Sequence, residues 1–212
     1  MEKYPLSYEV MGFYNDGKQT NPYYTVNHTS KVFDTSSAVD TTSGVSGVYL
    51  GAKKTLWRAD HGESDSPVPK SISAYASMTQ TFNDENTKGI QNQGNVGILF
   101  NHMFESRPFD SYGLSFQWAH LTDAEQNFLQ DANLVAGGSG YKVGQTETAL
   151  ALDANFILSK GVILSPFVMY SWDSNSMLNP YSAVNPESGV SFGATLHMKL
   201  DQILGLSGKT AH

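Results

Sequence analysis

Gly189-Val-Ser-Phe-Gly-Ala-Thr-Leu-His-Met-Lys-Leu200 is the most informative stretch of the chain, because apolar and polar residues alternate along its whole length. A two-residue period places the apolar row on one face of a β-strand and the small or polar row on the other. Strands of soluble sheets usually have about 5–6 residues, whereas a strand that crosses a bilayer needs about 9–11. This stretch is long enough to cross a membrane.

The same alternation recurs along the chain and predicts an all-β protein. We place about nine strands at 5–14, 22–30, 45–58, 71–83, 94–104, 112–121, 146–158, 161–172 and 189–200. Even-numbered positions carry the apolar residues, as at Met78, Ile98 and Leu152, and odd-numbered positions are mostly small or polar. A short helix is expected to begin at the capping-box pattern Thr122-Asp-Ala-Glu125 and to reach Gln130.

The lengths of the connections favour an antiparallel up-and-down transmembrane β-barrel. Membrane barrels have short periplasmic turns and longer extracellular loops. Here the connections tend to alternate in the same way, which places the long ones outside the cell. The short connections are 15–21, 105–111 and 159–160, and the long ones are 31–44, 122–145 and 173–188. The alternative is a soluble extracellular β-sandwich that binds carbohydrate or protein through its long loops.

Composition excludes several other classes of protein. None of the 212 residues belongs to an apolar run long enough for a membrane-spanning helix, which needs about 18 residues. Charged residues are only 16% of the chain, against about 25% in ordinary globular proteins. The net charge of −7 argues against a nucleic-acid partner, and the absence of cysteine excludes disulfides. No signal peptide is visible at the first residues.

Several short motifs occur in an informative order: Met11-Gly-Phe-Tyr-Asn-Asp-Gly-Lys18, Gly47-Val-Tyr-Leu-Gly-Ala-Lys-Lys-Thr-Leu-Trp-Arg58 and Arg107-Pro-Phe-Asp-Ser-Tyr-Gly-Leu-Ser-Phe-Gln-Trp-Ala-His-Leu-Thr-Asp123. The last contains an arginine-proline turn, an aspartate, a glycine-led strand and a Thr-Asp exit. In this order the motifs resemble the carbohydrate-selective outer-membrane porin family (OprB-type). The resemblance covers most of the chain but only the C-terminal half of the family's length.

The resemblance implies a porin, or a piece of one, through which carbohydrates and other small solutes diffuse passively. We expect residues 1–200 to form a partial barrel of about nine strands in the bacterial outer membrane, followed by a tail at 201–212. Its partners would be small sugars and outer-membrane lipid. An odd strand count would leave the two termini on opposite sides of the membrane. We therefore expect an incomplete barrel, completed by a missing N-terminal half or by a homo-oligomer.

Eight charged or aromatic residues are candidates for lining the pore and contacting the substrate. By parity they belong to the polar face: Glu9, Tyr49, Lys53, Trp57, Tyr75, Glu147, Asp153 and Lys199. The charged members would set selectivity if this face lines a water-filled channel, and would be solvated surface residues in a sandwich. The aromatic members would stack against sugar rings or simply fill space. Both interpretations remain open from the sequence.

Nothing in the sequence indicates an enzyme. The six histidines lack metal-ligand spacing, so we expect no metal site. The sequence shows no Ser-His-Asp arrangement and no paired carboxylates that would serve catalysis. A passive channel needs neither a catalytic residue nor a cofactor, and we expect none.

We predict that even-numbered residues of 150–158, 162–172 and 190–200 face lipid and that their neighbours face the interior. The shared two-residue period is the reason. Spin labels placed one at a time at positions 190–199 should alternate in accessibility to a water-soluble relaxation agent. Uniform accessibility along the strand would contradict the assignment.

Overall fold

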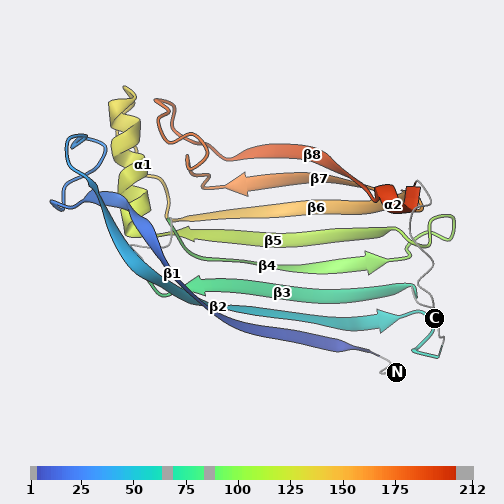
Figure 1. The fold of residues 1–212 in the computed structure, drawn as a ribbon. Coiled ribbons are helices and arrows are strands. Elements are labelled where there is room, and N and C mark those ends of the chain that lie inside the picture. The colour runs from blue at the N-terminus through green and yellow to red at the C-terminus, as the bar shows by residue number, and fades with distance from the viewer. Residues whose placement is uncertain (1–3, 64–68, 84–88, 204–212) are drawn as a thin grey trace.

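The computed structural model describes residues 4–63, 69–83 and 89–203, and their strands form one antiparallel eight-stranded sheet. Each strand pairs with its neighbours in chain order, as Figure 1 shows, so the expected all-β, up-and-down topology is confirmed. The strands are β1 (Leu6–Thr25), β2 (Val39–Arg58), β3 (Ser71–Thr81), β4 (Ile90–Asn101), β5 (Ser111–Leu121), β6 (Thr146–Ser159), β7 (Val162–Trp172) and β8 (Gly189–Met198). A short helix, α2 (Leu200–Ile203), follows β8, and the rest of the expected tail, 204–212, lies outside the described residues.

The first strand is where the sequence prediction was wrong. Strands had been expected at 5–14 and 22–30 with a turn at 15–21, but β1 continues through this region as one strand. The Asn15-Asp-Gly17 signal produces an irregularity in the pairing with β2 instead of a turn, and the Asn15 side chain accepts a hydrogen bond from the Gly17 N–H at 2.9 Å. The sheet therefore has eight strands, and both of its outer strands have a terminus at the same end.

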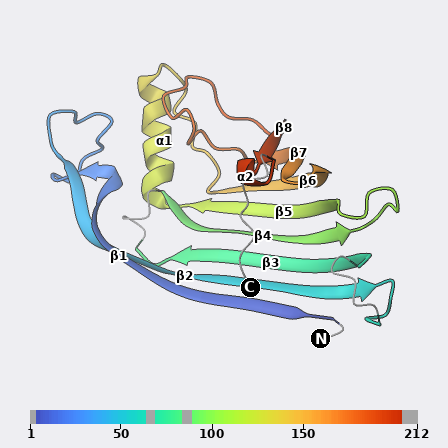
Figure 2. The ribbon, with the colours of Figure 1, turned by 45° about the vertical axis from the view of Figure 1, so that its right-hand side comes forward.

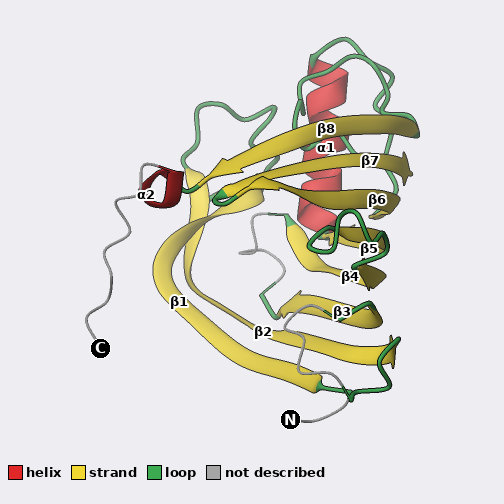
Figure 3. Ribbon diagram, turned by 90° about the vertical axis from the view of Figure 1, so that its right-hand side faces the viewer, coloured by secondary structure: helices red, strands yellow, loops and turns green. Residues whose placement is uncertain are grey.

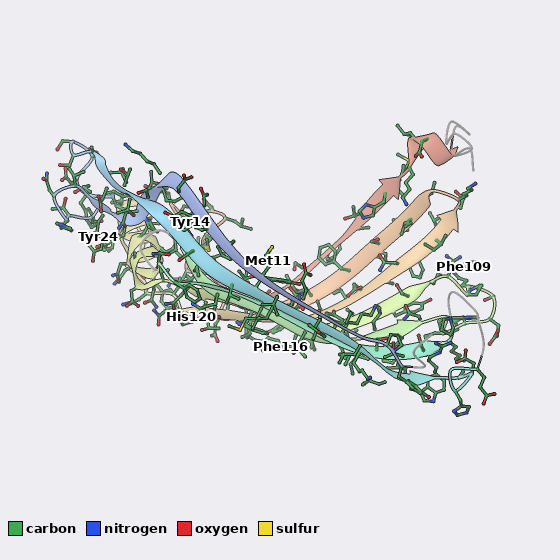
Figure 4. All side chains as sticks on the ribbon, turned by 60° about the horizontal axis from the view of Figure 1, so that its bottom comes forward. Met11, Tyr14, Tyr24, Phe109, Phe116 and His120 are labelled. Atoms are coloured by element: carbon green, nitrogen blue, oxygen red, sulfur yellow. The ribbon has the colours of Figure 1, made fainter. Side chains whose placement is uncertain are left out.

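The connections fall at two ends of the sheet, which we call the helix end and the terminal end. The helix end carries the connections 26–38, 82–89, 122–145 and 173–188. The terminal end carries 59–70, 102–110 and 160–161, together with the start of β1 and the finish of β8. Figure 4 shows Tyr24 at the helix end and Phe109 at the terminal end. The predicted long connections at 31–44, 122–145 and 173–188 thus share one end, as expected.

The register keeps the two faces of the sheet separate. Even-numbered residues lie opposite even-numbered residues over most of every strand pair, for example Leu50 opposite Met78 and Leu152 opposite Val168. We call the side formed by these residues the apolar face, and the side formed by their odd-numbered neighbours the polar face. Ser73 and Ser115 of the polar face are only 2% and 4% exposed, whereas Leu152 of the apolar face is 54% exposed. A curved sheet crowds the side chains on its hollow side, so the polar face is the concave one.

Among the residues that the structure describes, a compact core forms only at the helix end, around α1 (Asp123–Val135). Thr122 caps the helix by accepting a hydrogen bond from the Glu125 N–H at 3.1 Å, as its sequence pattern predicted. Leu129 is buried against Leu121 and Val143, and the helix runs beyond the expected Gln130, where Ala132 and Asn133 are buried as well. Tertiary packing thus lengthens a helix that its cap starts.

Helix α1 connects the two sides of the sheet across the helix end. Figures 1 and 2 show it standing steeply across the strand direction, beside the ends of the strands. On one flank the Asp131 carboxylate accepts hydrogen bonds from the hydroxyls of Tyr23 (2.9 Å) and Ser30 (2.6 Å). On the other flank the Asn133 amide donates to the Ser182 carbonyl at 2.8 Å, and Phe128 contacts Tyr181 edge-on. The helix therefore lies between the end of β1 and the connection that leads to β8.

The sheet is curved but not closed. Figure 3, which views it from the terminal end, shows β1 and β8 on opposite sides of an open trough. Among the described residues each of these two strands pairs with one neighbour only, β1 with β2 and β8 with β7. The expectation of a partial barrel agrees with this shape.

We predict that Asp131→Asn loosens α1 from β1. The carboxylate accepts two hydroxyl hydrogen bonds, and hydrogen bonds to a charged group are worth about 1.5–3 kcal/mol each. Amides of α1 should exchange with solvent faster in the variant. Glu187→Gln, an acid-to-amide change at an exposed position of the 173–188 connection, is the control. Equal exchange in both variants would show that Asp131 does not hold the helix.

Candidate functional site

Tyrosine side chains shape the polar face of the sheet, because their hydroxyl ends lie over glycines. A Cβ atom added to Gly97 would stand 2.7 Å from ring atoms of Tyr75, and one added to Gly51 would stand 2.7 Å from the Tyr49 hydroxyl. Each ring therefore occupies the space that a larger neighbour would fill.

Four of the predicted site residues meet in one hollow on the polar face of β1 to β4. We call it the tyrosine hollow, and its volume is about 540 Å³. Its wall includes Glu9, Tyr49, Lys53 and Tyr75. Lys53 lies opposite Tyr75 in the register, and Tyr75 lies opposite Gly97. These four residues give the hollow one acid, one base and two aromatic rings.

A second hollow adjoins the first and is built mainly from uncharged polar groups. We call it the amide hollow, with a volume of about 320 Å³. It shares Ser77 and Asn95 with the tyrosine hollow and adds Gln93, Gln117 and Glu147. The Ser77 hydroxyl donates to the Asn95 side-chain oxygen at 3.2 Å. Sequence reasoning missed these amides because it considered charged and aromatic residues only, although their odd-numbered positions give the needed signal.

Glu147 belongs to the amide hollow but also has a structural contact. Its carboxylate accepts hydrogen bonds from the backbone N–H of Asn175 at 3.1 Å and from the Asn175 side chain at 2.7 Å. The acid therefore fastens the connection 173–188 to the start of β6. Asp153 lies farther along the same strand and leans over Gly113, where an added Cβ atom would stand within 2.4 Å of its carboxylate oxygen.

Besides Asp153, two predicted site residues line neither hollow. A bulge between Thr55 and Trp57 places Trp57 opposite Ile72, which belongs to the apolar face. The parity expected for Trp57 is therefore wrong, because the extra residue in the bulge reverses the alternation. Lys199 follows β8 at the terminal end, where its backbone N–H donates to the Gly161 carbonyl at 2.8 Å.

The Arg107-Pro-Phe-Asp110 motif has a structural role at the terminal end. The buried Asp110 carboxylate accepts hydrogen bonds from the Arg107 guanidinium and, at 2.9 Å, from the Ile157 N–H of β6. Burial by itself raises the pKa of Asp110, but these hydrogen bonds outweigh it and lower the pKa below its ordinary value. The Arg107 side chain also lies over the Phe156 ring at 5.4 Å. The motif therefore connects the turn before β5 to β6, the strand that follows β5.

An acid and a base face each other at the helix end. Burial raises the pKa of Glu125 in α1, and the positive charge of Lys31 partly offsets this. Burial likewise lowers the pKa of Lys31, with Glu125 acting in the opposite direction. The Lys31 ammonium also lies 4.3 Å from the centre of the Phe128 ring. These contacts hold the connection 26–38 against the helix.

The described part of the chain offers no group of three histidine, cysteine, aspartate or glutamate side chains suited to hold a metal ion. Of the two helices described, neither α1 nor α2 has the length and apolar character of a membrane-spanning helix. The side chains that line the two hollows offer hydrogen bonding by hydroxyls and amides, contact with tyrosine rings, and the field of a few charges.

Two comparisons with known proteins give a match, and both matches are to OprB proteins. The sequence model of a family described as "Carbohydrate-selective porin, OprB family" matches residues 2–185. The structure is similar to the high-pH structure of Pseudomonas putida OprB, with a TM-score of 0.66 and 18% sequence identity. The match covers 92% of this chain and 44% of that one, so the chain spans less than half of the solved protein's length. A search of curated protein sequences gives no match.

We predict that Gly97→Ala disturbs the tyrosine hollow. The added methyl group would meet both the Tyr75 ring and, at 2.6 Å, the backbone carbonyl of Leu114, which has little freedom to move. Overpacking of this kind lowers the free energy of unfolding by about 1–3 kcal/mol. Urea unfolding in detergent micelles measures it. Gly12→Ala is the matched control, because a Cβ atom there meets nothing within 4 Å. Equal midpoints for the two variants would contradict the prediction.

Proposed function

Because this chain belongs to the carbohydrate-selective porin (OprB) family, we propose that it forms part of the wall of a bacterial outer-membrane channel through which small carbohydrates and other small solutes diffuse passively. The observation that carries the proposal is the separation of the sheet into a continuous exposed apolar face and a continuous concave polar face. In this arrangement the apolar face contacts outer-membrane lipid and the polar face contacts the solutes.

The apolar face supports a lipid environment. Its side chains are large and open to the surroundings, with Phe192 83% exposed, Val190 65% exposed and Val96 48% exposed. In water so large an apolar surface would favour aggregation, whereas in a bilayer it is the normal outer surface of a barrel. A β-sandwich would need a second sheet to cover this face, and the described residues form only one. The soluble alternative is therefore disfavoured.

Lys54 is a charged side chain on the apolar face of β2, and its position agrees with a membrane environment. Its ammonium group donates to the Tyr4 carbonyl at 2.9 Å. Tyr4 precedes β1 at the terminal end, so the long side chain extends its charge toward that end of the sheet. A lysine that reaches the head-group region from a strand is tolerated at little cost.

The polar face supports contact with neutral sugars more than with ions. Sugars present hydroxyl groups at their edges and C–H groups on their ring faces. The amides and hydroxyls of Asn95, Gln117 and Ser77 match the first, and the flat rings of Tyr49 and Tyr75 match the second. Because the hollows are open troughs, they would retain a sugar weakly and release it, as passage through a channel requires.

The test of the proposed function is to express the chain in a Gram-negative bacterium and to refold it into vesicles. We expect the chain in the outer-membrane fraction and a requirement for detergent during purification. Vesicles in which the barrel is closed should swell in monosaccharide solutions faster than in solutions of a large oligosaccharide. A chain that stays monodisperse in plain buffer would overturn the proposal and favour the sandwich. Membrane insertion without any swelling would show that the chain provides no open path.

We predict that Tyr49→Ala with Tyr75→Ala weakens the interaction with sugars. Loss of two aromatic surfaces should raise the monosaccharide concentration that half-blocks ion current by roughly twofold to tenfold, on the scale of about 0.5–1.5 kcal/mol for an aromatic contact. Tyr170→Ala, on the apolar face, is the control. An unchanged blocking concentration would mean that the rings only fill space.

We predict that Glu147→Gln with Asp153→Asn lowers the preference of the channel for cations. Carboxylates in a confined pore raise the local concentration of cations, and salt screens this field. The reversal potential across a low-salt gradient should shift toward zero, while the flux of neutral sugar should change little. Glu105→Gln, a change at a side chain that is 87% exposed in a terminal-end connection, is the control. An unchanged reversal potential would place these acids outside the conducting path.

A further inference from the structure

A shallow groove of about 310 Å³ lies on the apolar face of β1 to β5, on the other side of the sheet from the two hollows. Its floor contains two alanines that lie opposite each other in the register, Ala52 of β2 and Ala76 of β3. We call it the alanine groove. The larger side chains around the floor are Tyr8, Val10, Leu50, Met78, Val96 and Trp118. The groove exists because two small residues lie among large ones.

Trp118 gives the alanine groove a fixed wall toward the helix end. Its indole N–H donates to the side-chain oxygen of Asn92 at 3.1 Å. Its ring lies over Gly94, where an added Cβ atom would stand 2.5 Å from a ring carbon. These two contacts hold the ring in place, so the shape of the groove does not depend on a ligand.

A lysine lies on the terminal-end side of the same groove. Lys54 follows Ala52 by two residues along β2, which is about 7 Å at the usual rise of a strand. Its register partners, Leu6 and Ala74, are both apolar. The Lys54 ammonium donates to the Tyr4 carbonyl at 2.9 Å, and this contact holds the positive charge on the terminal-end side. An apolar groove therefore begins beside a positive charge.

A phospholipid combines the two kinds of group that this surface would recognise. Because this inference rests on the proposed function, the apolar face is in contact with membrane lipid. Lipid tails are as apolar as the wall of the groove, so the groove selects an acyl chain by shape and van der Waals contact. Lysine binds phosphate as a point charge, and near the head groups it favours anionic lipids.

The position of Lys54 indicates which leaflet supplies the lipid. Connections at the terminal end are shorter on average than those at the helix end, and short turns of outer-membrane barrels are periplasmic. The periplasmic leaflet of the outer membrane consists of glycerophospholipids, whose phosphodiester groups reach Lys54 from that side. The net charge of −7 on the whole chain would repel anionic lipids in general. A preference for them at this groove must therefore be local.

We propose that Lys54 and the alanine groove bind one anionic phospholipid of the periplasmic leaflet. The phosphodiester lies beside the Lys54 ammonium, and one acyl chain lies over Ala52 and Ala76 against the Trp118 ring. The groove is directly behind the tyrosine hollow, because Gly51, Ala52, Ala76 and Ser77 belong to the walls of both. The lipid thus packs on the outer side of the strands that carry the tyrosines of the hollow.

The test uses Trp118 as a reporter, because bromine atoms on an acyl chain quench the fluorescence of a tryptophan that they contact. Trp57 and Trp172 are changed to phenylalanine, and the chain is reconstituted into phosphatidylcholine vesicles. Dibrominated phosphatidylglycerol or dibrominated phosphatidylcholine is then added in increasing fraction. We expect half-maximal quenching at a fraction of phosphatidylglycerol that is roughly threefold to fivefold lower. A chain that keeps only Trp172, on the apolar face of β7, is the control and should show no preference.

Substitutions separate the contribution of the charge from that of the groove. Lys54→Gln should remove the preference for phosphatidylglycerol, whereas Lys54→Arg, which keeps the charge, should retain it. Lys160→Gln, at an exposed position of the terminal end, is the matched control and should retain it too. Ala76→Leu fills the floor of the groove and should reduce the preference. Ala194→Leu, at an exposed position of the apolar face of β8, should leave it unchanged.

Three results would overturn the inference. The first is equal quenching of Trp118 by the two lipids, and the second is a preference that survives Lys54→Gln. The third is a Trp118 that neither lipid quenches while Trp172 is quenched normally, because a protein surface would then cover the groove. Failure of the proposed function gives a different result, in which neither tryptophan is quenched because the chain stays outside the bilayer. That result would overturn both proposals.

Discussion

Every feature of this molecule depends on the backbone register that keeps even-numbered residues opposite even-numbered residues across the strand pairs. Because side chains alternate along a strand, a slip of one residue at any pair would send a whole apolar row into the trough. The bulge between Thr55 and Trp57 shows the consequence locally, since one extra residue moves Trp57 to the apolar face. Apart from this bulge, the irregularities in β1, one at the start of β4 and one at the end of β6, the register holds. It gives the sheet one face suited to lipid and one suited to water.

Helix α1 connects the two sides of the sheet at the helix end, which strand pairing alone does not do. Strand pairing fixes neighbours but does not fix the distance between the first strand and the last. By contacting Tyr23 and Ser30 on one flank and Ser182 on the other, α1 holds the helix end open. The only compact core of the described residues, around Leu121, Leu129 and Val143, serves this contact. The hollows of the polar face remain accessible because the trough stays open.

Much of this was predictable from sequence. The period of two predicted the strands from β3 to β8 and their faces, because a local pattern of side chains reports directly on a pleated backbone. The capping box predicted the start of α1 for the same reason. The motifs from Met11 to Asp123 indicated the family, which the match over residues 2–185 confirms. Glu9, Tyr49, Lys53 and Tyr75 were identified by parity, and the register brings them into one hollow.

Other features depended on contacts between segments far apart in the chain. Asn15-Asp-Gly17 predicts a turn when only the local sequence is considered, yet β1 pairs with β2 on both sides of it and remains a single strand. This pairing changes the strand count and the end of the sheet at which β1 begins. The sequence shows no partner for Glu147, but in the structure the side chain of Asn175, which is distant in sequence, donates a hydrogen bond to its carboxylate. The amide hollow arises only where β3, β4, β5 and β6 lie side by side. The sequence by itself therefore determined the alternation, the faces and the family, since these are local patterns. Only the tertiary structure decided the strand count, the openness of the trough and the grouping of polar side chains, because these depend on which strands become neighbours.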